Sequence, residues 1–200
     1  MKEICYKDLS WRKIRLALSL SLMRGEPVVI RNAFTFIESN FDFIPLYETV
    51  KRFFFDAGCG MLTDSGEDIQ FVPEGIMYGT FDIDTGGYTP ISEIELLLMP
   101  ALFGSEFRSV INYRGVTHSH LSYPTTFLKE SLFSLLERMG FYASMNLKRF
   151  GFYRSGGGLA ESRIYPAEIK PCADLFAFPE KSIEGAKVFM AGMNMEMAGR

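Results

Sequence analysis

The two histidines are the first residues whose type and spacing suggest chemistry. His118 and His120 stand two positions apart just after a predicted strand. In an extended chain both imidazoles would project from one face, which suits a metal ion or a phosphate. The nearest acidic residues, Glu106 and Glu130, stand at no recognisable ligand spacing. Two exposed loop imidazoles without a ligand are therefore the simpler interpretation, and no metal site is predicted.

Two arginines lie where the first amphipathic helix should begin. Arg12 and Arg15 fall in its first turns, and Asp8 or Ser10 is the expected N-cap. The free N–H groups and partial positive charge of a helix N-terminus attract anions, so these arginines could bind a phosphate. Arginine stems also cover apolar surface, and this second interpretation stays open.

Two glycine-rich segments are further candidates for contact with an anion. The run at 156–158 could donate backbone N–H groups, although a hairpin that needs positive φ also selects glycine. Asp82 and Asp84, followed by Thr85-Gly-Gly, resemble the entry to a helix. Capping of that helix is a sufficient explanation for the two acids.

The elements that must position these residues occur in an order that is found twice. The first unit is predicted to contain strands at residues 3–6, 27–31, 61–63 and 68–72 and helices at 11–22 and 43–54. The second is predicted to contain strands at residues 77–83, 107–113, 142–148 and 158–164 and helices at 91–103 and 128–139. The helix at 91–103 is expected to be broken near Pro100.

Each unit is thus β-α-β-α-β-β, in which two helices cover one face of a four-stranded sheet. We predict an α+β fold with two such tandem repeats, at residues 1–74 and 75–166. Residues 167–200 form a C-terminal stub, in which only 186–191 resembles a strand. Four methionines crowd the end of this stub: Met190, Met193, Met195 and Met197. They could bind copper, but thioethers more commonly fill gaps in a core or an interface.

Composition narrows the class of protein. With 48% hydrophobic and 22% charged residues, the 200-residue chain can bury a core, and its apolar runs are too short to span a membrane. The net charge of −3 does not by itself predict nucleic-acid binding, so any basic surface must arise on folding. Three cysteines without CxxC spacing, and no visible secretory signal, predict a cytoplasmic protein.

Four strings, taken in order, resemble the RNA 3′-terminal phosphate cyclase family. They lie at residues 15–27, 98–103, 115–127 and 149–158, and the last of them, Arg-Phe-Gly-Phe-Tyr-Arg-Ser-Gly-Gly-Gly, is the nearest match. Residues 186–192 are similar to the opening of that family's inserted domain. The resemblance implies the tandem repeats, a fold shared with enolpyruvyl transferases, and RNA 3′ ends, ATP and Mg²⁺ as ligands.

The family's residues carry over only in part at the first helix. The family's Glu-Gly-Gly-Gly-Gln string corresponds to residues 8–12, so Asp8 stands in place of the glutamate and Trp11 in place of a glycine. Glycines let a backbone approach a phosphate closely, and the bulk of Trp11 prevents this. Arg15 matches the arginine three residues further on. Asp8, Arg12 and Arg15 are the candidates for RNA or phosphate binding that the resemblance implies.

Other positions of the family's site differ more strongly. Its arginine-rich loop corresponds to the apolar residues 34–37, and its Arg-Gln pair to Ile44-Pro45. Each lost charge-assisted contact removes about 1.5–3 kcal/mol of phosphate binding. Pro124 and Phe127 match the segment that lines the nucleotide pocket, although a proline at a helix start and a phenylalanine in the core explain them without a ligand.

Family members convert an RNA 3′-phosphate to a 2′,3′-cyclic phosphate through a histidine-bound AMP, and that histidine belongs to a third repeat beyond residue 200. No catalytic residue is therefore predicted here. We expect a cyclase-like protein that is catalytically inactive and keeps a role in binding RNA or a protein partner. Two alternatives stay open: a split enzyme whose third repeat comes from a second chain, and a decayed gene product without a ligand.

Overall fold

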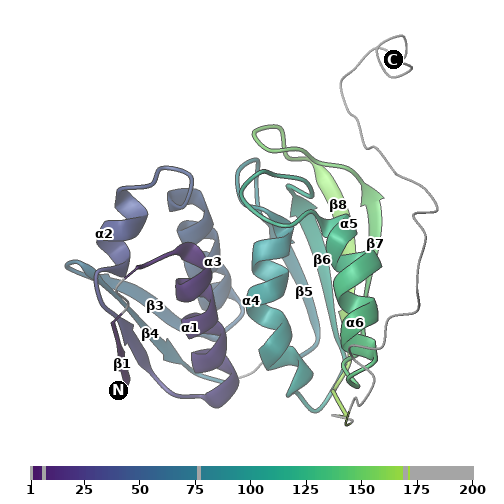
Figure 1. Ribbon diagram of the computed structural model, residues 1–200, viewed down its shortest axis with the longest axis horizontal. Helices are drawn as coiled ribbons and strands as arrows, with labels where there is room; N and C mark the ends of the chain where they lie inside the picture. Colours follow the sequence, from purple (N-terminus) through teal and green to yellow (C-terminus); the bar gives the residue numbers. More distant parts are fainter. Residues whose placement is uncertain (1, 6–7, 76–77, 169–170, 172–200) are drawn as a thin grey trace.

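Two four-stranded sheets, each covered by helices on one face, make up the protein (Figure 1). The computed structural model describes residues 2–5, 8–75, 78–168 and 171. Buried and exposed side chains alternate along most strands, as in β8, Gly158–Ile164, where every second residue is buried. This alternation follows from the pleat, which turns successive side chains to opposite faces of a sheet.

The first sheet has the strand order β1-β2-β4-β3, with β1 and β2 parallel and the other pairs antiparallel. Its strands are β1 Lys2–Ile4, β2 Val28–Ile30, β3 Gly60–Ser65 and β4 Asp68–Pro73. The helices of this unit are α1 Trp11–Arg24, α2 Ala33–Glu38 and α3 Ile44–Asp56. Helix α1 ends at Gly25, whose φ of 65° is the left-handed conformation that glycine adopts without strain.

The second sheet repeats this topology with the order β5-β6-β8-β7 and a parallel β5–β6 pair. The remaining strands are β5 Thr80–Asp84, β6 Ser109–Gly115 and β7 Ala143–Arg149. Its helices are α4 Ile91–Phe103 and a second one built from α5 Thr125–Phe127, the π-helical turn η1 Leu128–Leu132 and α6 Phe133–Glu137. The predicted α+β class with two β-α-β-α-β-β units is confirmed.

Three details differ from the predicted elements. The short helix α2 occupies residues that the sequence analysis left without an element, and η1 interrupts the helix predicted at 128–139. Helix α4 is not broken at Pro100 but runs through it to Phe103. Nearly all residues of α4 are buried, so packing on both sides outweighs the roughly 3 kcal/mol that an interior proline costs.

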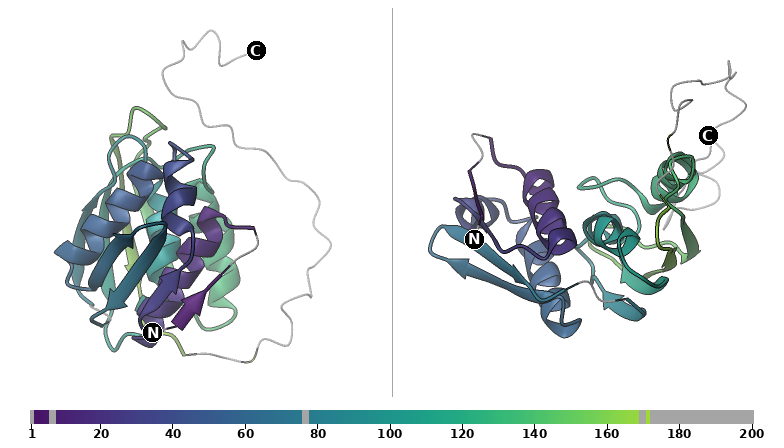
Figure 2. Two further views of the ribbon diagram at one scale, coloured as in Figure 1. Left: turned by 90° about the vertical axis from the view of Figure 1, so that its left-hand side faces the viewer. Right: turned by 90° about the horizontal axis from the view of Figure 1, so that it is seen from below.

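The two units share one hydrophobic core. Helices α1 and α4 lie side by side between the two sheets (Figure 2), and buried residues of both units form a single cluster. Phe53 of α3 contacts Phe81 of β5 edge-to-face, with ring centroids 6.0 Å apart. The parts of the chain that carry the predicted sites are therefore held against each other.

Some expectations fall outside the described residues. These are the strand at 186–191, the four methionines of the C-terminal stub, and the ends of the strands predicted at Tyr6 and Met77. The limits 1–74, 75–166 and 167–200 stay a prediction. Within the described part of the chain, no helix is long and apolar enough to cross a membrane.

Candidate functional site

The predicted phosphate-binding and nucleotide-pocket residues come together at one end of the molecule, where α1 and α4 begin. The Arg12 guanidinium lies 5.4 Å from the centre of the Tyr123 ring, and Tyr123 stacks on Phe127 at 5.0 Å. Arg15 bonds to Glu93, in the first turn of α4. Neither Glu93 nor Tyr123 was singled out by the sequence analysis. The signal for Glu93 was that it is one of two acids in a predicted helix that is mostly apolar.

Glu93 is the centre of this site, with a side chain only 4% exposed. Its Oε2 accepts hydrogen bonds from Trp11 Nε1 at 2.9 Å and from Arg15 Nη1 at 2.6 Å. Its Oε1 accepts a hydrogen bond from Ser122 Oγ at 2.5 Å, and Ser92 Oγ donates to that hydroxyl at 2.9 Å. We call these five residues the Glu93 cluster. They join the first unit to the second through a buried ion pair.

Arg15 is thus already neutralised by a carboxylate. A phosphate that bound to it would have to displace Glu93 and leave that carboxylate buried without its cation, which costs about 3–5 kcal/mol. Trp11 is buried as well and stacks on Phe43 at 6.0 Å, which in turn stacks on Phe36 at 5.6 Å. Aromatic rings therefore fill the space beside the first turn of α1.

The other charged candidates at this helix start remain at the surface. Ser10, not Asp8, is the N-cap residue: its backbone is extended, and its carbonyl accepts from Lys13 N and Ile14 N at 3.0 and 3.1 Å. Asp8 is exposed, and its carbonyl oxygen accepts from Lys13 Nζ. Arg12 is exposed over the Tyr123 ring. Asp8 and Arg12 therefore both keep their charges open to solvent, and Arg12 is the exposed cation of the three candidates.

Pro124 and Phe127 have different surroundings. Pro124 is the N-cap residue of α5, and its carbonyl accepts a hydrogen bond from Phe127 N at 2.9 Å. The explanation by a helix start therefore holds for Pro124. Phe127 is exposed on the surface beside Tyr123, so its placement in the core was wrong.

The two histidines face different neighbours. His118 is half-buried, with Nδ1 2.8 Å from Thr117 Oγ1 and Nε2 3.3 Å from Thr126 Oγ1, and burial lowers its pKa below the usual 6.5. Its ring lies 5.2 Å from that of Phe150. The interpretation as two exposed imidazoles was therefore wrong for His118. His120 is exposed.

The histidines also lack partners for a metal site. Among the described residues, no group of three or more His, Cys, Asp or Glu side chains could hold a metal ion. Mg²⁺ needs oxygen ligands, and both oxygens of Glu93, a buried carboxylate in the first turn of α4, already accept hydrogen bonds. Glu93 therefore does not fit as a ligand of the Mg²⁺ in the ATP–Mg²⁺ complex that the family implies.

The glycine-rich loop between β7 and β8 is explained by close packing of backbones. Gly156 N donates to Phe152 O at 2.8 Å, so this amide is used within the loop. A Cβ added at Gly158 would lie 2.7 Å from Gly115 O and 2.8 Å from Gly151 N. The close approach of this backbone to β6 is enough to explain a glycine at position 158, and no bound anion is needed for the explanation.

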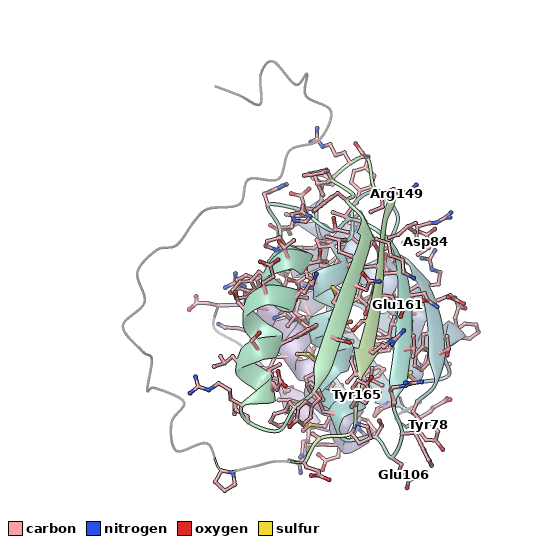
Figure 3. All side chains as sticks on the ribbon, turned by 90° about the vertical axis from the view of Figure 1, so that its right-hand side faces the viewer. Tyr78, Asp84, Glu106, Arg149, Glu161 and Tyr165 are labelled. Atoms are coloured by element: carbon pink, nitrogen blue, oxygen red, sulfur yellow. The ribbon has the colours of Figure 1, made fainter. Side chains whose placement is uncertain are left out.

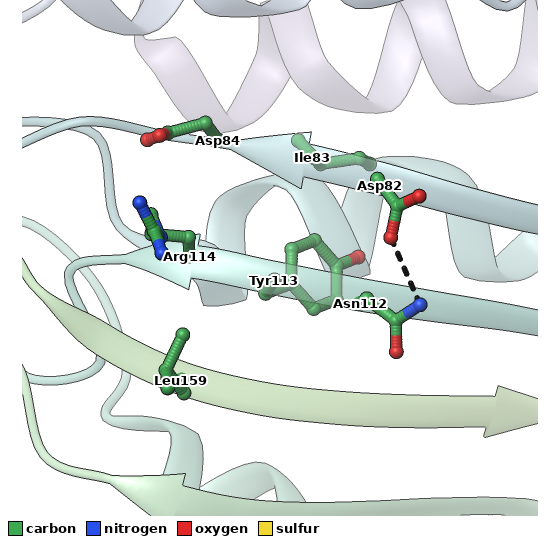
Figure 4. A pocket seen from close by; sticks show the side chains of 7 residues that line it. All are labelled: Asp82, Ile83, Asp84, Asn112, Tyr113, Arg114 and Leu159. Carbon is green, nitrogen blue, oxygen red and sulfur yellow. Dashed lines mark hydrogen bonds between the residues drawn. The ribbon is translucent and has the colours of Figure 1, made fainter.

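A hollow of about 340 Å³ lies on the outer face of the second sheet (Figure 4). Asp82, Asp84, Asn112 and Arg114 line it, and Asn112 Nδ2 donates to Asp82 Oδ1 at 2.9 Å. Asp84 Oδ1 accepts from Gly86 N at 2.8 Å, the local turn contact that the capping interpretation expects. This hollow lies on the solvent-facing side of a sheet. It differs from the Glu93 cluster, whose central carboxylate is buried.

Comparison with known proteins is consistent with this fold. The model of the family described as RNA 3′-terminal phosphate cyclase matches residues 50–191. The chain is 27% identical over 164 residues to an RNA 3′-terminal phosphate cyclase of Ectopseudomonas mendocina, covering 79% of this chain and 47% of that protein. It is 29% identical over 172 residues to one from Methanosarcina barkeri, covering 82% and 50%.

A third relative of the same name, from Koribacter versatilis, is 25% identical over 193 residues, covering 94% of this chain and 53% of that protein. The chain therefore spans about half the length of the curated relatives that it matches. Its two sheets of one topology and the family match over most of its residues agree with each other, and the chain belongs to the RNA 3′-terminal phosphate cyclase family.

Proposed function

We propose that this chain binds RNA and does not itself carry out adenylyl transfer or cyclisation. The family match and the names of the relatives support RNA as the ligand. The observation that carries the loss of catalysis is the Glu93 cluster, in which the arginine expected to meet a phosphate is paired with a buried carboxylate. The chain would then bind RNA without a contact between Arg15 and the terminal phosphate.

The first test is self-adenylation. The purified chain is incubated with Mg²⁺ and ATP labelled at the α-phosphate, and the Methanosarcina barkeri relative serves as the positive control. We expect label on the relative and none on this chain. A labelled band at the mass of this chain would overturn the proposal, because no step of adenylyl transfer should be possible.

The second test measures RNA binding directly. Fluorescence anisotropy compares two short single-stranded RNAs of one sequence, which end in a 3′-phosphate or a 3′-hydroxyl. Because Arg15 is neutralised by Glu93, we expect both RNAs to bind within about twofold of each other. Salt should weaken both equally, since the remaining contacts are with the internal phosphates. Preference of tenfold or more for the 3′-phosphate, or no binding at all, would contradict the proposal.

A split enzyme is the second candidate, and one surface favours it. Leu16, Leu20 and Met23 are exposed on α1 at helical spacing, so they form an apolar stripe along the helix. The exposed residues Arg12 and Arg24 flank it, and the sequence of α1 contains no acidic residue. A solvated helix face normally carries charges of both signs. An apolar stripe would instead suit packing against a chain that corresponds to the other half of the relatives, which this chain does not match.

This candidate is tested by mixing. The part of the Ectopseudomonas mendocina relative outside the matched region is produced separately, added to this chain, and assayed with labelled ATP and 3′-phosphorylated RNA. A split enzyme would acquire label and form cyclic ends, and Leu20→Glu in the stripe would abolish both. Phe55→Glu on α3 is the matched charge control, because Phe55 is an apolar side chain that is 73% exposed. Mixtures that remain inactive would exclude this candidate and favour the non-catalytic role.

A further inference from the structure

Aromatic side chains gather at the end of the second sheet where β5 and β6 terminate. Three separate segments supply them: the loop before α4, the segment after β6 and the loop between β7 and β8. We call this set the aromatic face, and its members are Tyr88, His120, Phe150, Phe152 and Tyr153. Ligands of sheets with parallel strands commonly bind at this edge, beyond the carboxyl ends of the strands.

Ring contacts hold the aromatic face together. Tyr153 lies 5.7 Å from Tyr88 and 4.9 Å from His120, in both cases edge-on. Phe150 and Phe152 stack at 6.5 Å, and the ring of His118 lies within 5.6 Å of each. The backbone joins the two groups, because Tyr153 N donates to His118 O at 3.1 Å. The rings are therefore fixed before any ligand arrives.

Large parts of these rings are open to solvent. Tyr88 is 49% exposed and Phe150 is 42% exposed. The first unit also reaches this end, because Asp42 Oδ1 accepts a hydrogen bond from Tyr153 Oη at 2.6 Å. The residue before it, Phe41, is 84% exposed. Exposed rings held in fixed positions offer π-faces at a low entropic cost.

Two arginines border the aromatic face. Arg154 lies 5.9 Å from the centre of the Tyr153 ring, and Arg149 donates from Nε to Gly157 O at 2.5 Å. Both are exposed, and Figure 3 places Arg149 at the end of the sheet opposite Tyr78, Glu106 and Tyr165. Asp42 and Asp84 are the acids nearby, and they are engaged with Tyr153 Oη and Gly86 N. Exposed cations therefore stand next to exposed rings.

We propose that the aromatic face binds single-stranded RNA by stacking its unpaired bases on Tyr88 and Phe150, with Arg149 and Arg154 near the phosphates. Rings that accept stacked bases beside cations that follow the backbone are the combination by which proteins bind single strands. The exposed side chains that define the face are rings, whereas an interface with a protein helix would resemble the aliphatic stripe of Leu16, Leu20 and Met23 on α1.

This inference rests on the proposed binding of RNA and specifies which surface and which part of the RNA are involved. It places the recognition on the unpaired bases and not on Arg15 of the Glu93 cluster. The terminal phosphate then contributes little, and duplex RNA, whose bases are already stacked and paired, should bind poorly.

The test uses fluorescence anisotropy with the full chain and a labelled ten-nucleotide single-stranded RNA that ends in a 3′-hydroxyl. We expect Phe150→Ala and Tyr88→Ala each to weaken binding by about tenfold, because a stacked base contributes about 1–3 kcal/mol. Phe150→Tyr, which keeps a π-face, should bind like the unaltered chain. Phe107→Ala is the matched control, since Phe107 is 57% exposed and packs on Tyr78 at the opposite end.

The outcomes separate the two proposals. If the unaltered chain binds the RNA and both alanine variants bind it equally well, the aromatic face is excluded and the proposed function stands. If the unaltered chain binds no RNA, the proposed function and the proposed role of the aromatic face are both refuted. Equal affinity for a duplex of the same sequence, or an equal loss with Phe107→Ala, would overturn base stacking. Circular dichroism of each variant checks that a loss of binding is not a loss of folding.

Discussion

At the scale of single residues, the two glutamates of α4 show how neighbours decide what a buried carboxyl does. Glu93 faces the first unit and is paired with Arg15. Glu95 faces the second sheet, where Tyr113 Oη and Ser162 Oγ donate to it at 2.7 and 2.6 Å. Burial raises the pKa of Glu95 above its usual 4.5, and burial with the adjacent Glu95 raises the pKa of Tyr113. One carboxyl is thus paired with a cation, whereas the other is buried among neutral hydroxyl donors.

Removal of Arg15 tests the ion pair of the Glu93 cluster. Arg15→Ala should lower the free energy of unfolding by about 3–5 kcal/mol, because it leaves a buried carboxylate without its cation. The measurement is urea denaturation at pH 7 followed by circular dichroism. Arg12→Ala, three residues earlier and exposed over Tyr123, should cost less than about 1 kcal/mol. Equal losses for the two variants would show that the buried pair does not stabilise the junction.

The pKa of Glu95 predicts a dependence of stability on pH. A carboxyl whose pKa is raised by folding stabilises the native state below its unfolded pKa, near 4.5, and this stabilisation is lost as pH rises through the folded pKa. Glu95→Gln cannot ionise, and its amide resembles the protonated carboxyl: the oxygen still accepts from one hydroxyl, while the NH2 group can only donate to the other. Its free energy of unfolding relative to the unaltered chain should therefore increase between pH 4.5 and pH 8 in urea titrations. A constant difference across that range would contradict burial of an ionisable Glu95.

At the scale of elements, contacts between residues far apart in the sequence stabilise some local structures that the hydrophobic periodicity does not predict. Helix α2 is one example: Phe34 N and Thr35 N donate to Glu67 O, in the turn between β3 and β4, at 2.9 and 3.3 Å. Two of the N–H groups in the first turn of this six-residue helix are thus satisfied from outside it. The glycine loop beside β8 is another, since its backbone packs directly on β6.

Substitution of Gly158 tests that close approach. A Cβ at this position would lie 2.7 Å from Gly115 O and from Thr117 Cγ2, so the backbone must shift. We expect Gly158→Ala to lower the free energy of unfolding by about 1–3 kcal/mol, as other overpacked sites do. Gly104→Ala is the control, because its Cβ would meet Ala101 O at an ordinary 3.4 Å. A Gly158→Ala variant as stable as the Gly104→Ala variant would contradict the packing explanation.

At the scale of the whole molecule, the two repeats are joined by a shared core and by the Glu93 cluster. Trp11 belongs to the first unit, yet its indole N–H donates to Glu93 in the second. It is the one tryptophan of the sequence, so its fluorescence reports on the junction. The described units therefore depend on each other for burial of α1 and α4.

This shared core predicts a single unfolding transition. Tryptophan fluorescence, which follows the junction, and far-ultraviolet circular dichroism, which follows both units, should give the same urea midpoint. A fluorescence midpoint well below that of circular dichroism would show that the junction opens first and that the repeats at 1–74 and 75–166 are separate cooperative units. Arg15→Ala should move both midpoints together.

The periodicity of the sequence predicted most of the fold, while the candidate site could be predicted only in part. Apolar side chains at strand or helix spacing are local signals, and they located the elements of both sheets to within a few residues. The resemblance also predicted that Trp11 and the segment at 34–37 stand where the family has phosphate-binding residues. The partner of Arg15 was not, because Glu93 stands 78 residues away in the sequence.

The sequence by itself determined the succession of the strands and of the longer helices, the twofold pattern of these elements and the resemblance to the family. Only the tertiary structure decided whether Arg15 is free to meet a phosphate, whether His118 is buried, and which exposed rings stand together. The physical reason is that hydrophobic periodicity arises within each element, whereas charge compensation, burial and ring stacking depend on neighbours that chain folding brings from distant positions.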